Sequence, residues 1–218
     1  MFKFVESLFR ALSNWGFCHR YPFWKMPDIW CEKRGLRGFV ERYSTTWYDS
    51  IPSGWRKAFG IALSDDLKEA CIAGMARAEE NGKKASWGDV ISIGDVKEKY
   101  GTLNIYASGS DTIQMVLDKY EHLSMGYCPL CGKPARYIMP GGYVLFICEE
   151  CFEPHVRVRS CVPANGSVED FKADHRLTRG DIPTITVYDG NGGSINTDPK
   201  GLFGIDLAKL WGLEGEDE

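Results

Sequence analysis

Hydrophobic residues recur at the spacing of amphipathic helices in three stretches of the chain. The first seventeen residues form one stretch, and we expect its apolar face to dock on the core. In the second stretch Ser53 is expected to cap a short helix, and Ser64 to start another. In the third, Asp111 is expected to cap a helix, with Gln114 closing a capping box. The apolar stripe of this third helix comprises Ile113, Val116, Leu117, Tyr120 and Leu123.

Alternating apolar and polar residues predict three β-hairpins. The first spans residues 90–106 around a two-residue Tyr100-Gly101 loop, and the second spans residues 135–147 around a Pro-Gly-Gly turn. The third begins with a strand over residues 182–188, before a flexible glycine-rich turn. Side chains of the first hairpin alternate between two faces, and one of these faces is polar. This polar face, which is either solvated or a ligand surface, carries Lys97, Lys99, Asn104 and Tyr106.

Four of the eight cysteines form two Cys-x-x-Cys pairs, Cys128/Cys131 and Cys148/Cys151, with sixteen residues between the pairs. Two residues between cysteines let a tight turn aim both thiolates at one ion, and the intervening hairpin brings the second pair beside the first. Thiolate ligands favour Zn²⁺ over Mg²⁺ or Ca²⁺. The pattern therefore predicts a zinc ribbon with one structural Zn²⁺, whose shell of four thiolates leaves no position for a catalytic water.

Together these elements predict an α+β fold, in which a β-hairpin packs on helices and a zinc ribbon is embedded. The length of 218 residues fits one good-sized core plus a small appendage. We expect four parts: an aromatic-rich helical and irregular segment over 1–46, an α+β core over 47–126, the zinc ribbon over 127–153, and a carboxy-terminal segment over 154–218 with a hairpin, a short helix and an acidic tail.

The composition excludes several classes of protein. Hydrophobic residues make up 44% of the chain and charged residues 26%, which is ordinary for a globular protein and excludes collagen-like, low-complexity and fully disordered chains. No apolar run approaches the roughly 18 residues that a membrane span needs, and the amino terminus lacks the pattern of a signal peptide. Cysteines without a disulfide framework indicate a reducing compartment, so we expect a cytoplasmic protein with no membrane partner.

Charge and aromatic residues are unevenly distributed. The net charge of −4 does not favour attraction of nucleic acid to the whole molecule. Residues 1–57, however, carry ten Lys and Arg against five Asp and Glu, and hold fourteen of the 28 aromatic residues. Aromatic residues interleaved with basic ones are typical of a core or protein interface, or of a surface that binds a nucleotide or single-stranded nucleic acid. The candidate binding residues in this region are Trp47, Trp55 and Arg56.

Enzymatic chemistry has one candidate pair. Asp174-His175 follows the ribbon and invites comparison with metal-dependent nucleases, in which an Asp-His pair near a zinc-bound hairpin binds a catalytic Mg²⁺, although there the pair lies between the cysteine pairs. Asn191 is the only later residue that could extend such a site. No phosphate-binding loop, nucleophile elbow or Cys/His arrangement is present, so we name no catalytic residue. A metal-dependent nuclease or nucleotide hydrolase is kept as the alternative to a non-enzymatic protein.

Several motifs occur in a specific order: Gly54-Trp55 opening a helix, the run from Lys97 to Tyr106 (KEKYGTLNIY), and the two cysteine pairs. Because of these motifs and their order, residues 47–153 resemble a group of small, mostly uncharacterised proteins of bacteriophages and prophages. The resemblance carries over no activity, but it implies a phage-encoded accessory factor that acts inside the infected cell. We therefore expect a zinc-stabilised, non-enzymatic binding protein that engages a host protein or host defence component. A minor virion or assembly component is a further alternative.

Overall fold

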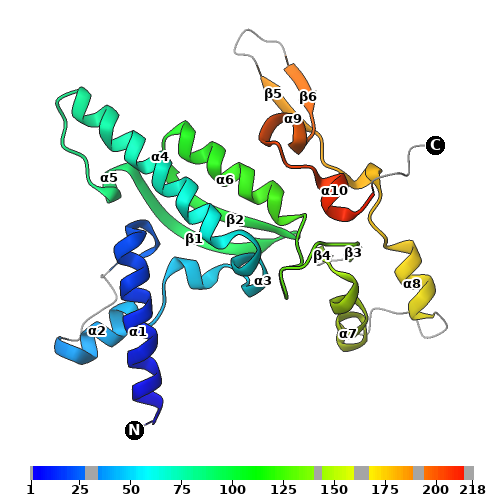
Figure 1. The fold of residues 1–218 in the computed structure, drawn as a ribbon, viewed down its shortest axis with the longest axis horizontal. Helices are drawn as coiled ribbons and strands as arrows, with labels where there is room; N and C mark the ends of the chain where they lie inside the picture. Colours follow the sequence, from blue (N-terminus) through cyan, green and yellow to red (C-terminus); the bar gives the residue numbers. More distant parts are fainter. Residues whose placement is uncertain (1, 28–33, 140–143, 160–166, 189–193, 214–218) are drawn as a thin grey trace. The chain divides into compact units, whose positions relative to one another are not determined.

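Helices and short antiparallel strands make up the protein (Figure 1). This architecture confirms the predicted α+β fold class, with a β-hairpin packed on helices and a cysteine ribbon embedded. In the described residues, no helix is long and apolar enough to pass through a membrane. The computed structural model describes residues 2–27, 34–139, 144–159, 167–188 and 194–213.

The chain divides into two compact units, which do not follow the order of the sequence. The first unit comprises residues 1–51, 60–97 and 105–117. The second comprises residues 52–59, 98–104 and 118–218. The four-part division expected from the sequence stays a prediction.

The first unit consists mainly of helices. They are α1 (Phe2–Arg20), the 3-10 turns η1 (Pro22–Trp24) and η3 (Trp47–Ser50), α2 (Gly35–Tyr43), α4 (Ile61–Glu80) and α5 (Trp87–Val90). Trp24 is fully buried, and its indole Nε1 donates a hydrogen bond of 2.9 Å to the Ser64 hydroxyl. The Tyr21 hydroxyl donates to the Asp65 carboxylate at 2.6 Å. These two bonds fix the segment around η1 to α4.

The helix that contains Ser64 does not begin at this residue, contrary to the prediction. From α3 (Ser53–Trp55) the chain continues through the π-helical turn η4 (Arg56–Gly60) directly into α4. The Ser64 hydroxyl donates to the Gly60 carbonyl at 2.8 Å and accepts the Trp24 indole N–H. Because its hydroxyl is used by these partners, Ser64 is a buried residue in the helix interior and not an N-cap.

Most of the predicted apolar face of α1 is exposed, and among its described side chains only Leu8 is half-buried, so the predicted docking of the face on the core is wrong. Phe9 is 69% exposed, Leu12 46% and Trp15 41%. The buried residues of α1 are instead the small Ala11 and Cys18, and α1 makes contacts with α2. The side of α1 that packs on the first unit therefore carries small side chains, together with the half-buried Phe17, whose ring lies 4.5 Å from that of Tyr48.

The first predicted hairpin is confirmed. Its strands are β1 (Ile91–Lys99) and β2 (Thr102–Gly109), which form a two-stranded sheet. Tyr100 has φ of 53° and Gly101 has φ of 82°, the pair of left-handed residues that a two-residue hairpin loop requires. Within the first unit, the end of the hairpin lies against the start of helix α6 (Asp111–Ser124) (Figure 1).

Helix α6 (Asp111–Ser124) follows the hairpin. The helix starts at Asp111 itself, and the Gln114 side chain donates to the Ala107 carbonyl at 3.1 Å instead of closing the predicted capping box. The predicted apolar stripe faces inward. Its buried members are Ile113, Leu117 and Tyr120.

The second unit contains two hairpins, as the sequence predicts. Strand β3 (Tyr137–Met139) pairs antiparallel with β4 (Leu145–Ile147), and β5 (Ile185–Tyr188) pairs with β6 (Ser194–Thr197). From Glu149 onwards, the helices of this unit are α7 (Glu149–Arg159), α8 (Val168–Asp174), the 3-10 turn η5 (Arg179–Asp181), α9 (Pro199–Phe203) and α10 (Leu207–Trp211). The predicted turn at 189–193 and the acidic tail at 214–218 lie outside the described residues.

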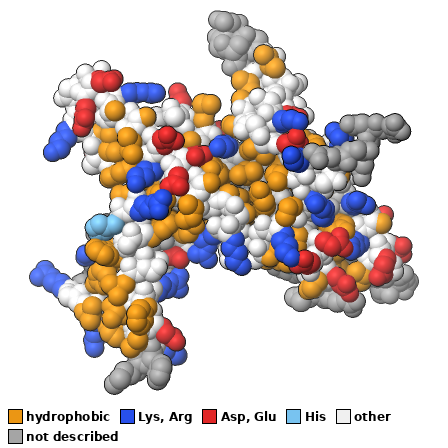
Figure 2. Space-filling view, in the orientation of Figure 1, with side chains coloured by type: hydrophobic (Ala, Val, Ile, Leu, Met, Phe, Trp, Pro, Cys, Tyr) orange, Lys and Arg blue, Asp and Glu red, His pale blue; other side chains and the backbone are white. Residues whose placement is uncertain are grey.

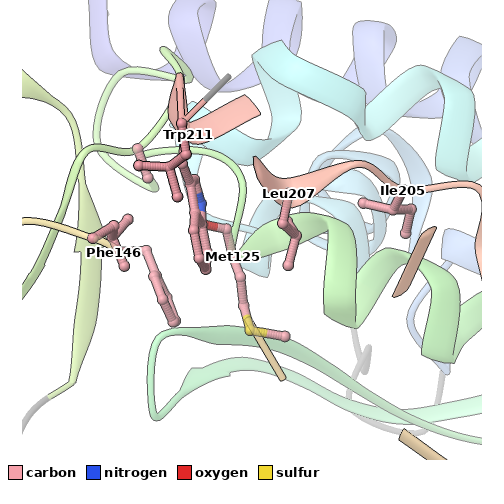
Figure 3. Packing of buried hydrophobic residues seen from close by; sticks show 8 residues of the cluster. Met125, Phe146, Ile205, Leu207 and Trp211 are labelled. Carbon is pink, nitrogen blue, oxygen red and sulfur yellow. The ribbon is translucent and has the colours of Figure 1, made fainter. Parts of the chain in front are cut away.

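A hydrophobic cluster joins α10 to the ribbon (Figure 3). Trp211 stacks on Phe146 of β4, with ring centroids 5.9 Å apart and planes inclined by 14°. The indole Nε1 of Trp211 also donates to the Met125 carbonyl at 3.1 Å. Ile205 and Leu207 are buried in the same cluster. The carboxy-terminal segment therefore shares a core with the ribbon.

Candidate metal centre

The first cysteine pair lies in a tight turn. The backbone N–H of Gly132 donates to the Cys128 carbonyl at 2.9 Å, and the N–H of Cys128 donates to the Lys133 carbonyl at 2.8 Å. Gly132 has φ of 86°, a conformation that favours glycine. The backbone amide of Lys133 also hydrogen-bonds the Cys131 thiol. The turn therefore directs a backbone amide at a sulfur atom, where it stabilises a thiolate.

The second cysteine pair lies at the start of a helix. Cys148 directly precedes α7, and Cys151 lies in the first turn of α7. The backbone amide of Cys151 hydrogen-bonds the Cys148 thiol, and the N–H of Phe152 donates to the Cys148 carbonyl at 3.1 Å. The positive end of the helix dipole favours thiolates at this position.

The four sulfur atoms are arranged as one group. All four Sγ atoms lie within 4.8 Å of one another, and those of Cys131 and Cys148 are 3.4 Å apart. In a tetrahedral shell with bonds of about 2.3 Å, sulfur atoms are about 3.8 Å apart, so the group fits one tetrahedral ion. Cys128 and Cys148 are buried, and none of the four forms a disulfide. In the part of the chain that the structure describes, no other three His, Cys, Asp or Glu side chains meet in this way.

Burial and the closeness of the sulfur atoms shift the pKa values of three of the four thiols. Burial raises the pKa of Cys148 to about 11, and burial together with Cys128 also raises the pKa of Cys151. Although burial opposes it, hydrogen bonds from the Lys133 amide and the other cysteines lower the pKa of Cys131. A bound metal ion would supply the missing positive charge and release the thiol protons. The four cysteines could therefore bind a metal ion.

Gly54 and Trp55 support the first cysteine turn from outside. The N–H of Gly54 donates to the Pro129 carbonyl at 2.8 Å, and the Trp55 indole Nε1 donates to the Tyr127 carbonyl at 2.8 Å. A Cβ atom at position 54 would lie 2.3 Å from the Cys128 carbonyl oxygen, so this approach requires glycine. Trp55, a candidate binding residue, is fully buried and helps to position the metal ligands.

The loop of the first hairpin contacts the ribbon. A Cβ atom at Gly101 would lie 2.9 Å from the Phe146 ring, and the N–H of Gly101 donates to the Glu98 carboxylate at 2.7 Å. The N–H of Leu103 donates to the Ser124 hydroxyl at 2.9 Å. The Gly54-Trp55 segment and the hairpin loop, far apart in sequence, thus both pack on the segment that carries the cysteines.

The structure brings together two residues of the predicted polar face. The Lys97 ammonium lies 4.7 Å from the centre of the Tyr106 ring and forms an ion pair with Asp95 at 2.5 Å. Lys99 is exposed, and Asn104 is half-buried. Because Lys97 already has two partners, its charge is satisfied within the strand pair without a ligand.

Of the remaining candidate residues, Arg56 is half-buried, and Trp47 lines a cavity together with Trp87. Trp87 was not predicted from the sequence. The signal that could have identified it is a four-residue pattern, Ser/Thr-Trp-x-Asp, which occurs at residues 46–49 and again at 86–89. In both copies the first and last residues form a reciprocal capping box.

The Asp174-His175 pair does not assemble a site in the described residues. The His175 ring stacks on Phe171 with centroids 4.1 Å apart, and its Nδ1 lies 2.6 Å from the Phe171 carbonyl oxygen. Asp174 is exposed. Neither residue belongs to a group of three potential metal ligands in this part of the structure, and Asn191 lies outside it. The nuclease alternative has no further support from these contacts.

The chain has no significant similarity to a known protein family, curated protein or solved structure.

Proposed function

We propose that the protein is a non-enzymatic binding protein, which a structural zinc ion stabilises and which engages a partner protein through α1. The first part of the proposal is supported by the cysteine group. The second is supported by the exposed face of α1.

Zinc is the ion that we assign to the four cysteines. Thiolates are soft ligands that bind zinc or iron in preference to Mg²⁺ and Ca²⁺, and structural zinc sites are closed tetrahedral shells of this composition. With four protein ligands, no coordination position is left for a water or a substrate. The ion contributes folding free energy to the ribbon and leaves recognition to other surfaces.

The observation that carries the binding function is the exposed apolar face of α1. Val5, Phe9 and Leu12 follow the i, i+4, i+7 spacing of a single helix face, with Phe4 and Trp15 beside them. Phe4 is 44% exposed and Val5 42%. Figure 2 shows hydrophobic side chains gathered along this helix. Contiguous exposed apolar side chains mark interaction sites, and aromatic residues contribute most to interface energies.

Basic side chains on α1 and on α2, which contacts α1, indicate the chemistry of the partner. Lys3 on α1 and Arg34 and Arg37 at α2 are exposed. Basic residues also outnumber acidic ones by ten to five over residues 1–57. We therefore propose a partner with an apolar groove flanked by acidic side chains, which receives α1 as an amphipathic helix.

The proposed partner is a host protein or a host defence component, and the proposed place of action is the host cytoplasm. This part of the proposal rests on the resemblance of residues 47–153 to phage and prophage proteins. A minor virion or assembly component would use the same face of α1. Detection of the chain in purified virus particles would favour that alternative.

The test compares Leu12→Glu with Ile72→Glu. Leu12 on α1 is 46% exposed and Ile72 on α4 is 49% exposed, so both substitutions place a charge at an exposed apolar position. The tagged full chain is purified from expressing host cells, and retained proteins are identified by mass spectrometry. We expect a protein that the wild type and Ile72→Glu retain to be lost from Leu12→Glu. Retention of the same proteins by both variants, or of none by the wild type, would overturn the proposal.

A further inference from the structure

The first compact unit contains a cavity of about 220 Å³, and most of the residues that line it are apolar. The side chains of Phe23, Ile91 and Ile93 are buried at its wall. Trp47 and Trp87 line it as well and are half-buried, so part of each tryptophan remains accessible. An apolar cavity of about 150 Å³ binds benzene, and the larger volume here is therefore sufficient for one ring or two fused rings.

One sequence pattern, Ser/Thr-Trp-x-Asp, occurs twice, and each copy places its tryptophan at this cavity. In both copies a helical turn begins at the tryptophan, and the first and last residues of the pattern close a capping box. The Thr46 N–H donates to Asp49 at 2.8 Å, and the Ser86 N–H donates to Asp89 at 2.8 Å. These bonds fix the backbone at both tryptophans before a ligand binds, and an ordered wall reduces the entropy that binding costs.

The acidic groups of these two turns have partners within the protein. The Asp49 carboxylate forms an ion pair with Arg10 at 3.5 Å and accepts a hydrogen bond from the Asn14 amide at 3.2 Å, in addition to its capping bond. The Asp89 carboxylate accepts a second bond from Ser86, donated by the hydroxyl at 2.6 Å. Neither carboxylate therefore needs a cationic ligand as a partner.

The basic group at the cavity has partners as well. Lys25 lines the cavity, and its ammonium lies 5.9 Å from the centre of the Tyr43 ring. Lys25 also interacts with another group of the protein. An anionic ligand would compete with these contacts, whereas an uncharged ligand leaves them intact.

We propose that this cavity binds an uncharged aromatic ring of the size of phenol or indole, with Trp47 and Trp87 as its walls. The neighbouring charges are compensated within the protein, so a charged ligand would lose its hydration without gaining a partner. Aromatic walls favour an aromatic ring over an aliphatic one, because aromatic pairs contribute more than their buried area alone. The site uses no residue of the exposed face of α1 and no cysteine of the metal centre, so it is independent of the proposed function.

The test follows the indole N–H signals of the full-length protein by NMR at neutral pH. Trp47→Leu and Trp87→Leu each remove one signal from the spectrum of the seven tryptophans and so assign it. The ligands form two matched pairs: indole with indole-3-acetate, which adds a negative charge, and phenol with cyclohexanol, which is not aromatic. We expect indole and phenol to shift both signals. Indole-3-acetate is expected to bind about tenfold more weakly than indole, and cyclohexanol about threefold more weakly than phenol.

The proposal is overturned if neither indole nor phenol shifts the two signals. It is also overturned if indole-3-acetate binds as tightly as indole, or cyclohexanol as tightly as phenol. These titrations of the wild type test the proposal on their own if a cavity variant does not fold.

Trp15→Leu is the matched control for the two cavity variants. Trp15 is 41% exposed on α1 and does not line the cavity. We expect Trp47→Leu and Trp87→Leu to bind indole about tenfold more weakly than the wild type, as reported by the tryptophan signal that each retains at the cavity. Trp15→Leu is expected to bind indole as the wild type does. Wild-type affinity in both cavity variants, or an equal loss in all three, would contradict the assignment of the site.

Discussion

The backbone N–H of Gly54 donates to the carbonyl of Pro129 at 2.8 Å, inside the turn that carries the first cysteine pair. The Trp55 indole donates to the Tyr127 carbonyl next to the same turn. Two hydrogen bonds thus join the start of a helical segment to the backbone around the first cysteine pair. A substitution at Gly54 is therefore expected to act on the metal centre, although residue 54 is far from the cysteines in sequence.

Gly54→Ala is predicted to destabilise the protein by about 1–3 kcal/mol, because the added methyl group overpacks the first cysteine turn. The new Cβ would lie 2.3 Å from the Cys128 carbonyl oxygen and 2.6 Å from the Pro129 backbone. Urea unfolding followed by circular dichroism measures the change, and a chromogenic chelator measures the rate of metal release, which is expected to rise.

Gly16→Ala provides the control for this substitution. Gly16 lies inside α1, and a Cβ atom there meets nothing within 4 Å. Alanine in a helix interior is favoured over glycine by about 0.5–1 kcal/mol, so Gly16→Ala is expected to stabilise the protein. Equal unfolding free energies for the two variants would contradict the role of Gly54.

Cys128→Ser and Cys148→Ser are predicted to lose the metal ion and to unfold the ribbon. Metal binding contributes roughly 10–16 kcal/mol to the folding of isolated zinc-finger peptides, so the loss of one ligand has a large effect. Cys18→Ala is the control, since Cys18 is buried in α1 and lies outside the cysteine group. Elemental analysis and thermal unfolding are the measurements. A Cys128→Ser protein with wild-type metal content and melting temperature would argue against a structural metal.

Ser64→Ala is predicted to cost about 1–3 kcal/mol, because it leaves the buried Trp24 indole N–H without an acceptor. Ser7→Ala is the matched control. The Ser7 hydroxyl makes a similar bond to the Lys3 carbonyl at 2.8 Å, but in an exposed position, so a change within about 0.5 kcal/mol is expected. If both variants unfold at the same urea concentration, the Trp24–Ser64 bond does not stabilise the core as stated.

The sequence was most informative where local chemistry dictates the structure. Two residues between cysteines close a tight turn, and Tyr100-Gly101 adopts the left-handed conformations that a two-residue hairpin loop requires. The predicted strand pairs of the ribbon and of the carboxy-terminal segment form for the same reason, since their alternating pattern and turn residues are local signals.

Tertiary contacts account for what could not be predicted. Ser64 has the sequence context of an N-cap, but Trp24, forty residues away, uses its hydroxyl in the interior of a helix. The apolar face of α1 has the pattern of a core helix, yet Ala11 and Cys18 make the buried side. Periodicity shows that a helix has an apolar face and does not show whether the chain itself covers that face.

The Ser86–Asp89 capping box is predicted to resist mild acid. Hydrogen bonds from Ser86 lower the pKa of Asp89 from its ordinary value of 3.8. The Ser86 hydroxyl has the larger effect, and the Ser86 backbone N–H has the smaller one. A carboxylate whose pKa is lowered by folding stabilises the folded state above its unfolded pKa, and this contribution is lost as the pH falls through the folded pKa. The Trp87 indole signal is therefore expected to be constant in neutral solution and to shift only below pH 3.8.

Asp89→Asn is the control for this titration, because it removes the titrating group and keeps the shape of the side chain. In this variant the acid-induced shift of the Trp87 signal should disappear. A midpoint above pH 3.8 in the wild type would contradict the capping box as the cause.

The proposed non-enzymatic function depends on the proposed closed shell of four thiolates around the metal ion, and X-ray absorption at the zinc edge measures that shell most directly. For the purified full-length protein, we predict one zinc ion per chain with four sulfur ligands at about 2.3 Å and no oxygen or nitrogen ligand. An oxygen or nitrogen in the shell, or fewer than four sulfurs, would contradict this result. It would show an open coordination position, at which the metal could activate water.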